Sequence, residues 1–276
     1  MPQPQHYRQR LTGRIAIVTG AGSQGSDELG VGTGKAIAIV FAGEGARVCL
    51  VDREPERAER TRQLIAAAGG EAFVSAADVT LDADCRRVVA ETTARFGAPH
   101  ILVNNVGIAV GGGLTDFDET AWQRVMDVNL KSAILMSRHV VGPMAAQGGG
   151  AIVNIASIAG IRRYGALAYG PSKAAMIALT GEMAVLHGRD RIRANSIAPG
   201  HVFTPMSMGL LGDEARAERR KAGPLGIEGD AWDVAAAALF LASDEARFIT
   251  GVCIPVDGGV VETGSLLAHA MINSKG

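Results

Sequence analysis

The amino-acid sequence predicts a single α/β domain in which helices cover both faces of a doubly wound, seven-stranded parallel sheet. Short runs rich in β-branched residues alternate with longer amphipathic segments from Arg14 onward, which is the pattern of parallel strands and covering helices. No segment rich in proline or in charge divides this series. Hydrophobic residues make up 47% of the 276 residues and charged residues 20%, so one large core can be buried.

The strand candidates are short, apolar and spaced regularly along the chain. Ligands of a doubly wound sheet bind beyond the carboxyl ends of its strands, so the residues that follow each candidate are the first place to look for a site. The seven candidates are Ile15–Val18, Arg47–Val51, Ala72–Ser75, Ile101–Val103, Ala151–Ile155, Ile192–Ile197 and Val252–Pro255.

The helix candidates lie between the strands, and several show apolar residues recurring at the helical period, as a buried face requires. They are Lys35–Ala42, Glu56–Ala68, Asp82–Phe96, Glu119–Ala146, Tyr169–His187 and Trp232–Ala242.

Three segments fall outside this regular alternation. Residues 1–12 are expected to form a flexible N-terminal segment ahead of a domain that spans 13–261. Within it, residues 203–230 combine methionines and leucines with a charged stretch and are expected to form a substrate lid, with a surface helical pair as the alternative. The tail, 262–276, either crosses to a neighbouring subunit or frays.

The charge and cysteine content restrict the partners and the compartment. A net charge of −1 without any block of Lys or Arg argues against nucleic acid. The three cysteines are far apart and show no metal-binding spacing, so we expect reduced thiols, no metal and a cytoplasmic protein. The polar N-terminus does not resemble a signal peptide, and no run approaches about 20 apolar residues, so no membrane association is expected.

A glycine-rich segment follows the first strand. Thr19-Gly20-Ala21-Gly22-Ser23 and then Gly30-Val31-Gly32-Thr33-Gly34-Lys35 lead into a helix, and such glycines let the backbone approach a pyrophosphate at the helix N-terminus. A magnesium-dependent phosphate loop is excluded, because Leu29 replaces its first glycine and Ala36 replaces its Ser or Thr.

The second strand is followed by a carboxylate that bears on the choice of cofactor. Asp52 can accept hydrogen bonds from both ribose hydroxyls of NAD and would repel the additional phosphate of NADP. The adjacent Arg53 could tolerate that phosphate, and an alternative is that Asp52 only caps a turn while Arg53 faces solvent. We expect NAD.

Two side chains at the start of a predicted helix can perform acid/base chemistry. Tyr169 and Lys173 are four residues apart and project from the same face. A nearby ammonium and a cationic nicotinamide would favour the ionised phenol, so tyrosine could exchange a proton near neutral pH. The hydroxyl of Ser157, after the fifth strand, could hydrogen-bond a substrate oxygen that gains negative charge.

With these elements the sequence resembles the short-chain dehydrogenase/reductase family from about Gly13 to Gly259. No single motif is specific, but all of them occur in the family's order. The matching motifs are Thr19-Gly20 with Gly32 and Gly34, Asp78-Val79, Asn104-Asn105-Val106-Gly107, Asn129, Ser157, Tyr169-x-x-x-Lys173, Pro199-Gly200, Thr204 and Val256-Asp257-Gly258-Gly259.

The resemblance implies a single Rossmann domain, a homotetramer (or a homodimer) and a role for each motif. Asp78 and Val79 should border the adenine, Asn104 and Gly107 the cofactor along the fourth strand, and Lys173 the nicotinamide ribose. The implied catalytic set is Asn129, Ser157, Tyr169 and Lys173, in which Asn129 bends its helix and holds a water that links Lys173 to solvent. The expected cofactor-binding residues are Gly20, Gly22, Ser23, Gly32, Thr33, Gly34, Asp52, Arg53, Asp78, Val79, Asn105, Val106, Gly107, Tyr169, Lys173, Pro199, Gly200, Val202 and Thr204.

The glycine-rich segment departs from the family pattern. Residues 21–31 stand between Thr-Gly and Gly-x-Gly where the family has three, an insertion of eight that includes Asp27 and Glu28. Acidic groups are poor neighbours for a pyrophosphate, so these two should point outward. The insertion leaves open which of Gly22, Gly25 and Gly30 touches the ligand.

The expected substrate pocket is mostly apolar and suits a small or medium-sized alcohol or ketone. Arg162 and Arg163 could bind an acidic substrate group, although surface or subunit salt bridges are the commoner fate of such residues. Its expected lining is Ile108, Ile158, Tyr164, Leu167, His201, Phe203 and the methionines of residues 203–230.

The function predicted from the sequence is NAD-dependent hydride transfer between a secondary alcohol and its ketone, with Tyr169 as acid/base. The alternatives are an NADP-preferring carbonyl reductase and a dinucleotide-binding regulatory protein without turnover. A sugar-nucleotide epimerase is disfavoured, because the region after the sixth strand is too short for a second substrate domain.

Overall fold

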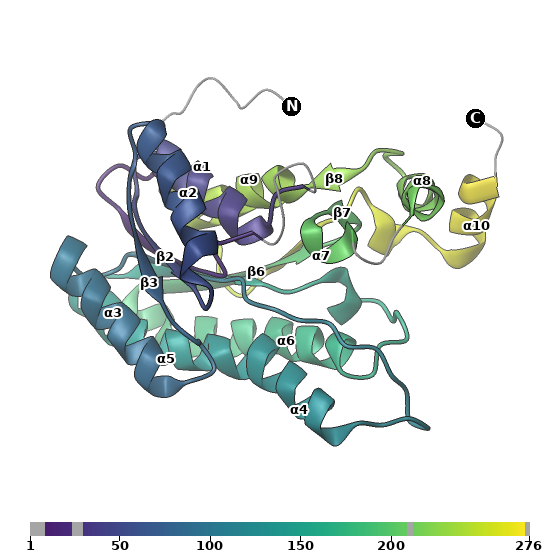
Figure 1. The fold of residues 1–276 in the computed structure, drawn as a ribbon, viewed down its shortest axis with the longest axis horizontal. Coiled ribbons are helices and arrows are strands. Elements are labelled where there is room, and N and C mark those ends of the chain that lie inside the picture. The colour runs from purple at the N-terminus through teal and green to yellow at the C-terminus, as the bar shows by residue number, and fades with distance from the viewer. Residues whose placement is uncertain (1–8, 24–29, 209–211, 274–276) are drawn as a thin grey trace.

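The computed structural model describes residues 9–23, 30–208 and 212–273, and its centre is the predicted seven-stranded parallel sheet (Figure 1). The strand order is β3-β2-β1-β4-β5-β6-β9, so the winding direction reverses between β1 and β4. The strands are β1 (Ile15–Thr19), β2 (Arg47–Asp52), β3 (Glu71–Ala76), β4 (Ile101–Asn104), β5 (Gly150–Ile155), β6 (Ile192–Pro199) and β9 (Cys253–Val256). A crevice opens beside such a reversal, at the carboxyl ends of the strands.

Helices cover both faces of this sheet and divide the core into two layers (Figure 1). One layer packs β1 and its neighbours against α1 (Thr33–Gly43), α2 (Pro55–Ala67) and α9 (Ala231–Ala242). The other packs against α3 (Asp82–Phe96), α5 (Ser132–Ala146) and α6 (Tyr169–His187). The central strand β1 is buried along its whole length, which explains its continuous apolar sequence.

The long helix expected over 119–146 is interrupted. It begins as α4 (Glu119–Met126), passes through a π turn at Asp127–Lys131 and continues as α5. A π turn inside a helix often occurs at a functional site, and this one contains Asn129.

Residues ahead of Gly13 pack against the domain. Leu11 is only 1% exposed, and its amide donates to the carbonyl of Glu44 at 2.9 Å. The part of the expected flexible segment that the structure describes, residues 9–12, is therefore anchored to the end of α1, while residues 1–8 lie outside the described residues.

Residues 203–230 form two surface helices and part of a small second sheet. Strands β7 (Val202–Phe203) and β8 (Gly229–Asp230) pair with each other and enclose α7 (Pro205–Met208) and α8 (Asp213–Ala222). The tail is helical where it is described: α10 (Ser265–Asn273) packs against α8 (Figure 1). Among the described residues, no helix has both the length and the apolar character needed to cross a membrane.

Candidate active site

A large cleft runs across the carboxyl ends of the central strands, with a volume of about 1170 Å³. All of the residues expected to border the cofactor except Asn104 line it, from Gly20 beyond the end of β1 to Thr204 beyond β6. Ser157, Tyr169 and Lys173 line the same cleft. The parallel sheet therefore brings together motifs that are up to 184 positions apart in the sequence.

The glycine-rich loop lies in close contact with the start of α1. A Cβ built at Gly34 would lie 2.0 Å from the carbonyl oxygen of Gly20, so only glycine fits there. The Asn105 side chain stabilises this loop by donating to the carbonyls of Thr19 (3.1 Å) and Gly20 (3.2 Å).

The N-terminus of α1 suits a pyrophosphate. Its N-cap is Gly32, which makes no side-chain cap, and its first turn contains no acidic residue. Amide groups in this position attract anions because of the helix dipole and their unsatisfied N–H groups. Asp27 and Glu28, which were expected to point outward, and Gly25 lie outside the described residues.

Asp52 both caps a turn and lines the cleft. Its Oδ2 accepts the amide of Gly22 and its Oδ1 accepts the amide of Glu54, each at 3.0 Å. The capping alternative is thus seen in the structure, but each carboxylate oxygen retains acceptor capacity for a ribose hydroxyl. Arg53 and Arg57, the second of which the sequence did not single out, line the cleft close by.

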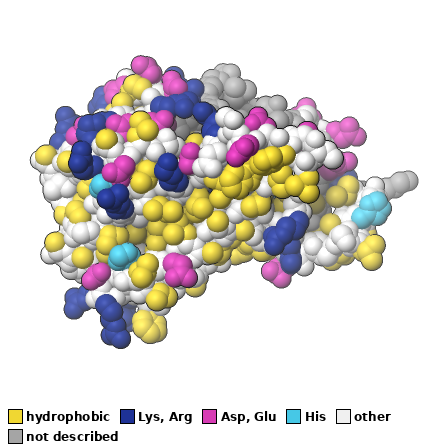
Figure 2. Space-filling view, turned by 90° about the horizontal axis from the view of Figure 1, so that it is seen from below, with side chains coloured by type: hydrophobic (Ala, Val, Ile, Leu, Met, Phe, Trp, Pro, Cys, Tyr) yellow, Lys and Arg dark blue, Asp and Glu magenta, His cyan; other side chains and the backbone are white. Residues whose placement is uncertain are grey.

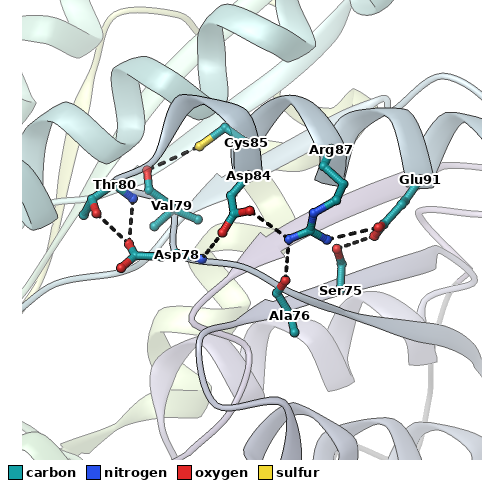
Figure 3. A network of polar contacts seen from close by, with 9 residues as sticks. All are labelled: Ser75, Ala76, Asp78, Val79, Thr80, Asp84, Cys85, Arg87 and Glu91. Carbon is teal, nitrogen blue, oxygen red and sulfur yellow. Dashed lines mark hydrogen bonds and ion pairs between the residues drawn. The ribbon is translucent and has the colours of Figure 1, made fainter.

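A polar network holds the loop that follows β3 (Figure 3). Asp84 accepts the amide of Asp78 at 2.8 Å, and Asp78 in turn accepts the amide of Thr80 at 2.9 Å. Arg87 joins the network by donating to Asp84 at 3.0 Å and to the carbonyl of Ala76 at 2.6 Å. Asp78 and Val79 are thereby fixed at the edge of the cleft.

Asn104 does not border the cleft as expected, because it points into the core. Its amide donates to Asn154 (2.9 Å) and to Ser137 (3.2 Å), and the residue is 5% exposed. Side chains alternate along a strand, so the following residue, Asn105, takes the position at the cleft.

Lys173 is buried in the wall of the cleft. Its Nζ donates to the carbonyl of Ile155 at 2.8 Å, and burial lowers the pKa of its ammonium to about 8. A Cβ at Gly107 would lie 3.2 Å from Nζ, so this glycine gives the ammonium its access to the cleft.

Tyr169 begins α6 one turn before Lys173. Burial raises the pKa of its phenol, and a hydrogen bond with Ser157 opposes this rise. The rise is caused by the loss of water around the phenol, whereas the lowering expected from the sequence concerns a phenol beside a bound cationic nicotinamide. The Ser157 hydroxyl also accepts the amide of Ala159 at 3.1 Å, which fixes its orientation.

Asn129 lies behind the cleft and does not line it. The side chain is fully buried; it accepts the amide of Ile108 at 2.7 Å and donates to Ser172 at 3.0 Å. It therefore connects the loop after β4 to the helix that carries Tyr169 and Lys173, which makes it a positioning residue. Ser172 was missed by the sequence analysis, although it stands next to Lys173 in the motif.

The substrate end of the cleft contains four of the expected residues: Ile108, Ile158, Tyr164 and His201. Met206 lines it as well, whereas Leu167 and Phe203 do not. The ring of Phe203 is instead covered by the guanidinium of Arg216, 3.8 Å from the ring centroid, and packs against Gly30.

The arginines that were considered for an acidic substrate do not reach this end. Arg162 donates through Nε to the carbonyl of Val261 at 2.7 Å, and Arg163 is exposed. Arg219, on α8, lines the cleft instead. The charged stretch in which it stands gives no sign of which residue faces inward.

A glycine-rich loop at a helix N-terminus and a Tyr–Lys pair in one cleft suit a dinucleotide-dependent oxidoreductase, and comparisons with known proteins agree. A family model described as enoyl-(acyl carrier protein) reductase matches residues 30–261. The 2-(S)-hydroxypropyl-CoM dehydrogenase 3 of Xanthobacter autotrophicus is 36% identical over 257 residues, which cover 91% of this chain and 98% of that protein.

Solved structures show the same likeness. A chain described as a short-chain dehydrogenase/reductase from Burkholderia xenovorans is 45% identical, with a TM-score of 0.87 and coverage of 93% of this chain and 99% of that one. A 7α-hydroxysteroid dehydrogenase in complex with NADH and 7-oxoglycochenodeoxycholic acid is 32% identical, with a TM-score of 0.84 and coverage of 93% and 98%. The chain belongs to the short-chain dehydrogenase/reductase family. It is thus an oxidoreductase that uses a nicotinamide cofactor, NAD or NADP.

Proposed function

We propose that this protein is an NAD-dependent dehydrogenase that interconverts a secondary alcohol and its ketone, with Tyr169 as the acid/base. The observation that carries the proposal is the cleft itself, in which Ser157, Tyr169 and Lys173 stand beyond the glycine-rich loop and Asp52. The proposal is also supported by relatives whose names describe alcohol dehydrogenases, such as the (+)-borneol dehydrogenase 2 of Salvia officinalis, which is 34% identical.

Each side chain has a distinct role in this proposal. The bound nicotinamide dinucleotide supplies the hydride acceptor or donor. In oxidation the ionised Tyr169 oxygen takes the proton of the alcohol, and in reduction the Tyr169 hydroxyl returns it to the substrate oxygen. Ser157 hydrogen-bonds the same substrate oxygen as its charge changes. Lys173 places a positive charge behind the phenol, with Nζ 5.8 Å from the centroid of the Tyr169 ring.

The preference for NAD depends on Asp52. A carboxylate at the end of β2 favours the two ribose hydroxyls of NAD and repels a 2′-phosphate. The presence of Arg53 and Arg57 at the same edge of the cleft favours the second candidate, an NADP-preferring carbonyl reductase. We also infer a cytoplasmic location, which is supported by the free thiols of Cys49, Cys85 and Cys253.

The proposed activity is tested by following NADH formation over a panel of open-chain and cyclic secondary alcohols, and NADH consumption over the matching ketones. We expect turnover of at least one alcohol–ketone pair in both directions. A protein that binds NADH but turns over none of these pairs would contradict the proposal and favour a regulatory role.

The cofactor preference is tested in the same assay with Asp52→Ala and the matched variant Asp78→Ala. We expect the wild type to prefer NAD, and Asp52→Ala to lower the NAD/NADP ratio of kcat/KM by about 10-fold or more, as removal of a single charge repulsion allows. Asp78→Ala should leave the ratio within about threefold. A wild type that prefers NADP would establish the second candidate.

A further inference from the structure

One arginine at the substrate end of the cleft plays no part in the proposed chemistry. Arg219 projects from α8 and lines the cleft together with Tyr164 and His201. The carbonyl of Arg219 lies 3.4 Å from Nδ1 of His201, and the rings of His201 and Tyr164 meet edge to face at 6.3 Å. Its backbone is therefore held beside residues of the cleft wall.

The side chain of Arg219 lacks the partners that its neighbour has. Arg216, one turn earlier, forms two hydrogen bonds with the carboxylate of Glu228, at 3.1 and 2.6 Å, and covers the ring of Phe203. Within the part of the chain that the structure describes, the guanidinium of Arg219 has no hydrogen bond or ion pair. It is half-buried, and this burial lowers its pKa.

The carboxylates near this end of the cleft are already engaged. Glu228 attracts Arg219 but is bound by Arg216. The charge of Asp257 acts to raise the pKa of both Tyr164 and His201, and its carboxylate accepts the amides of Gly259 (2.9 Å) and Val261 (2.8 Å).

Three more charged residues line the cleft from the side of α4 and the π turn, namely Glu119, Arg124 and Asp127. Asp127 accepts the Gln123 amide at 3.1 Å and lies 3.6 Å from Lys131. A partly desolvated guanidinium that faces a cleft without a fixed counter-charge is suited to a ligand that carries one.

We propose that Arg219 binds an oxyanion, such as a carboxylate, borne by the substrate at the end remote from its reacting hydroxyl or keto group. The inference deepens the proposed function and rests on it. Because the guanidinium presents a planar fork, a carboxylate can be held by two parallel hydrogen bonds, and the alcohol is then oriented from both ends. The substrate class becomes secondary hydroxy acids and the corresponding keto acids.

The first test compares secondary hydroxy acids of increasing chain length with their methyl esters in the wild type, Arg219→Gln and Arg220→Gln. Arg220 is the matched control because it is the next residue of α8 and is exposed. We expect the wild type to prefer one of the acids to its ester. Arg219→Gln should lose about 10- to 100-fold in kcat/KM for that acid and less than about threefold for its ester, as the loss of a charged hydrogen bond predicts.

The second test measures binding and does not need turnover. Titration of the NADH-loaded protein with hexanoate and with hexanamide should show tighter binding of the acid in the wild type and in Arg220→Gln, and no preference in Arg219→Gln. This result would support the anion site even if the alcohol panel gave no activity, so the failure of the proposed function can be told apart from the failure of this inference.

The inference is overturned by a wild type that turns over esters as well as or better than acids. Equal losses on acid and ester in Arg219→Gln would overturn it too, since they would indicate a structural role for the side chain. Rescue of the acid preference by Arg219→Lys would support a charge contact. The part of the preference that lysine does not restore would measure the contribution of the two parallel hydrogen bonds of the guanidinium to kcat/KM.

Discussion

At the scale of single residues, the site depends on a lysine held where water cannot reach it. Lys173 is buried, and its Nζ donates to the carbonyl of Ile155. Its ammonium therefore costs folding free energy, because a charge is moved out of water with little compensation. This charge has a function if it stabilises the ionised form of the Tyr169 phenol, whose own pKa is raised by burial.

The cost of this charge leads to a prediction about Lys173→Met. The folded pKa of about 8 lies below the unfolded value of 10.5, so the charged lysine destabilises the fold below pH 8, by about 3 kcal/mol. The lost hydrogen bond to Ile155 offsets about 1 kcal/mol of the gain. We expect the variant to be about 2 kcal/mol more stable than the wild type at pH 7 in urea unfolding.

The difference should fall and then reverse as the pH rises from about 8 to 10.5, since the wild-type lysine loses its proton in this range and its penalty with it, which leaves only the lost hydrogen bond of about 1 kcal/mol. The exposed Lys221→Met should show no such pH dependence. A Lys173→Met variant that is less stable than the wild type at pH 7 would contradict the assigned cost.

The residues that line the cleft could be predicted where a motif fixes the backbone. They could not be predicted where the orientation of a side chain depends on packing. Tyr169, Lys173 and Ser157 follow strand ends and a helix start, and the structure brings them together. Asn104 differs by one strand position from the residue that lines the cleft, and Arg219 stands among charged neighbours that only three-dimensional packing distinguishes.

At the scale of elements, the contact between the β1 loop and α1 determines the shape of the cofactor end of the cleft. The backbone of Gly34 lies against the carbonyl of Gly20 so closely that no side chain can be added. The helix N-terminus is thus brought to the strand end where a pyrophosphate would bind.

This contact predicts that Gly34→Ala weakens NADH binding by at least about 10-fold and destabilises the protein by about 2 kcal/mol or more, as overpacking does. The matched control is Gly181→Ala in α6, where an added Cβ meets nothing within 4 Å. That variant should be about 0.5–1 kcal/mol more stable than the wild type, since alanine favours the helix. Thermal unfolding and fluorescence titration with NADH measure both effects, and equal NADH affinities in the two variants would contradict the account.

The elements of the main sheet and the helices that cover it were predicted from the sequence, whereas the helix of the tail, α10, was not, and the helices of 203–230 were only the alternative to a lid. The seven strands and most helix ends follow from apolar periodicity and agree with the structure within a few residues. The two-residue strands β7 and β8 carry too few residues to show a period. The π turn leaves the apolar pattern of 119–146 unbroken, so only the resemblance to a family pointed to a bend at Asn129.

At the scale of the whole molecule, the face formed by α3, α4, α5 and α6 exposes apolar side chains across its middle (Figure 2). Exposed residues of these helices include Ile134 (43%), Val185 (79%) and Leu186 (69%). Apolar surface of this kind is usually covered by another molecule, and symmetric association of identical chains is the commonest way. We propose a homotetramer, with a homodimer as the alternative.

The oligomer is tested by light scattering coupled to gel filtration. We expect a mass of four chains of 28.6 kDa each for the wild type, and a smaller species for the double variant Val185→Glu/Leu186→Glu. Leu81→Glu, an exposed leucine ahead of α3, should leave the mass unchanged. A wild type that elutes as a monomer would contradict the proposal.

The central claim is that one cleft places the carbinol carbon of an alcohol between the bound nicotinamide and Tyr169. The most direct measurement uses a secondary alcohol deuterated at its carbinol carbon and determines the label in the NADH formed, by mass spectrometry. The account predicts one deuterium in each NADH and a rate lowered at least about 100-fold in Tyr169→Phe. Unlabelled NADH, or full activity in Tyr169→Phe, would contradict it.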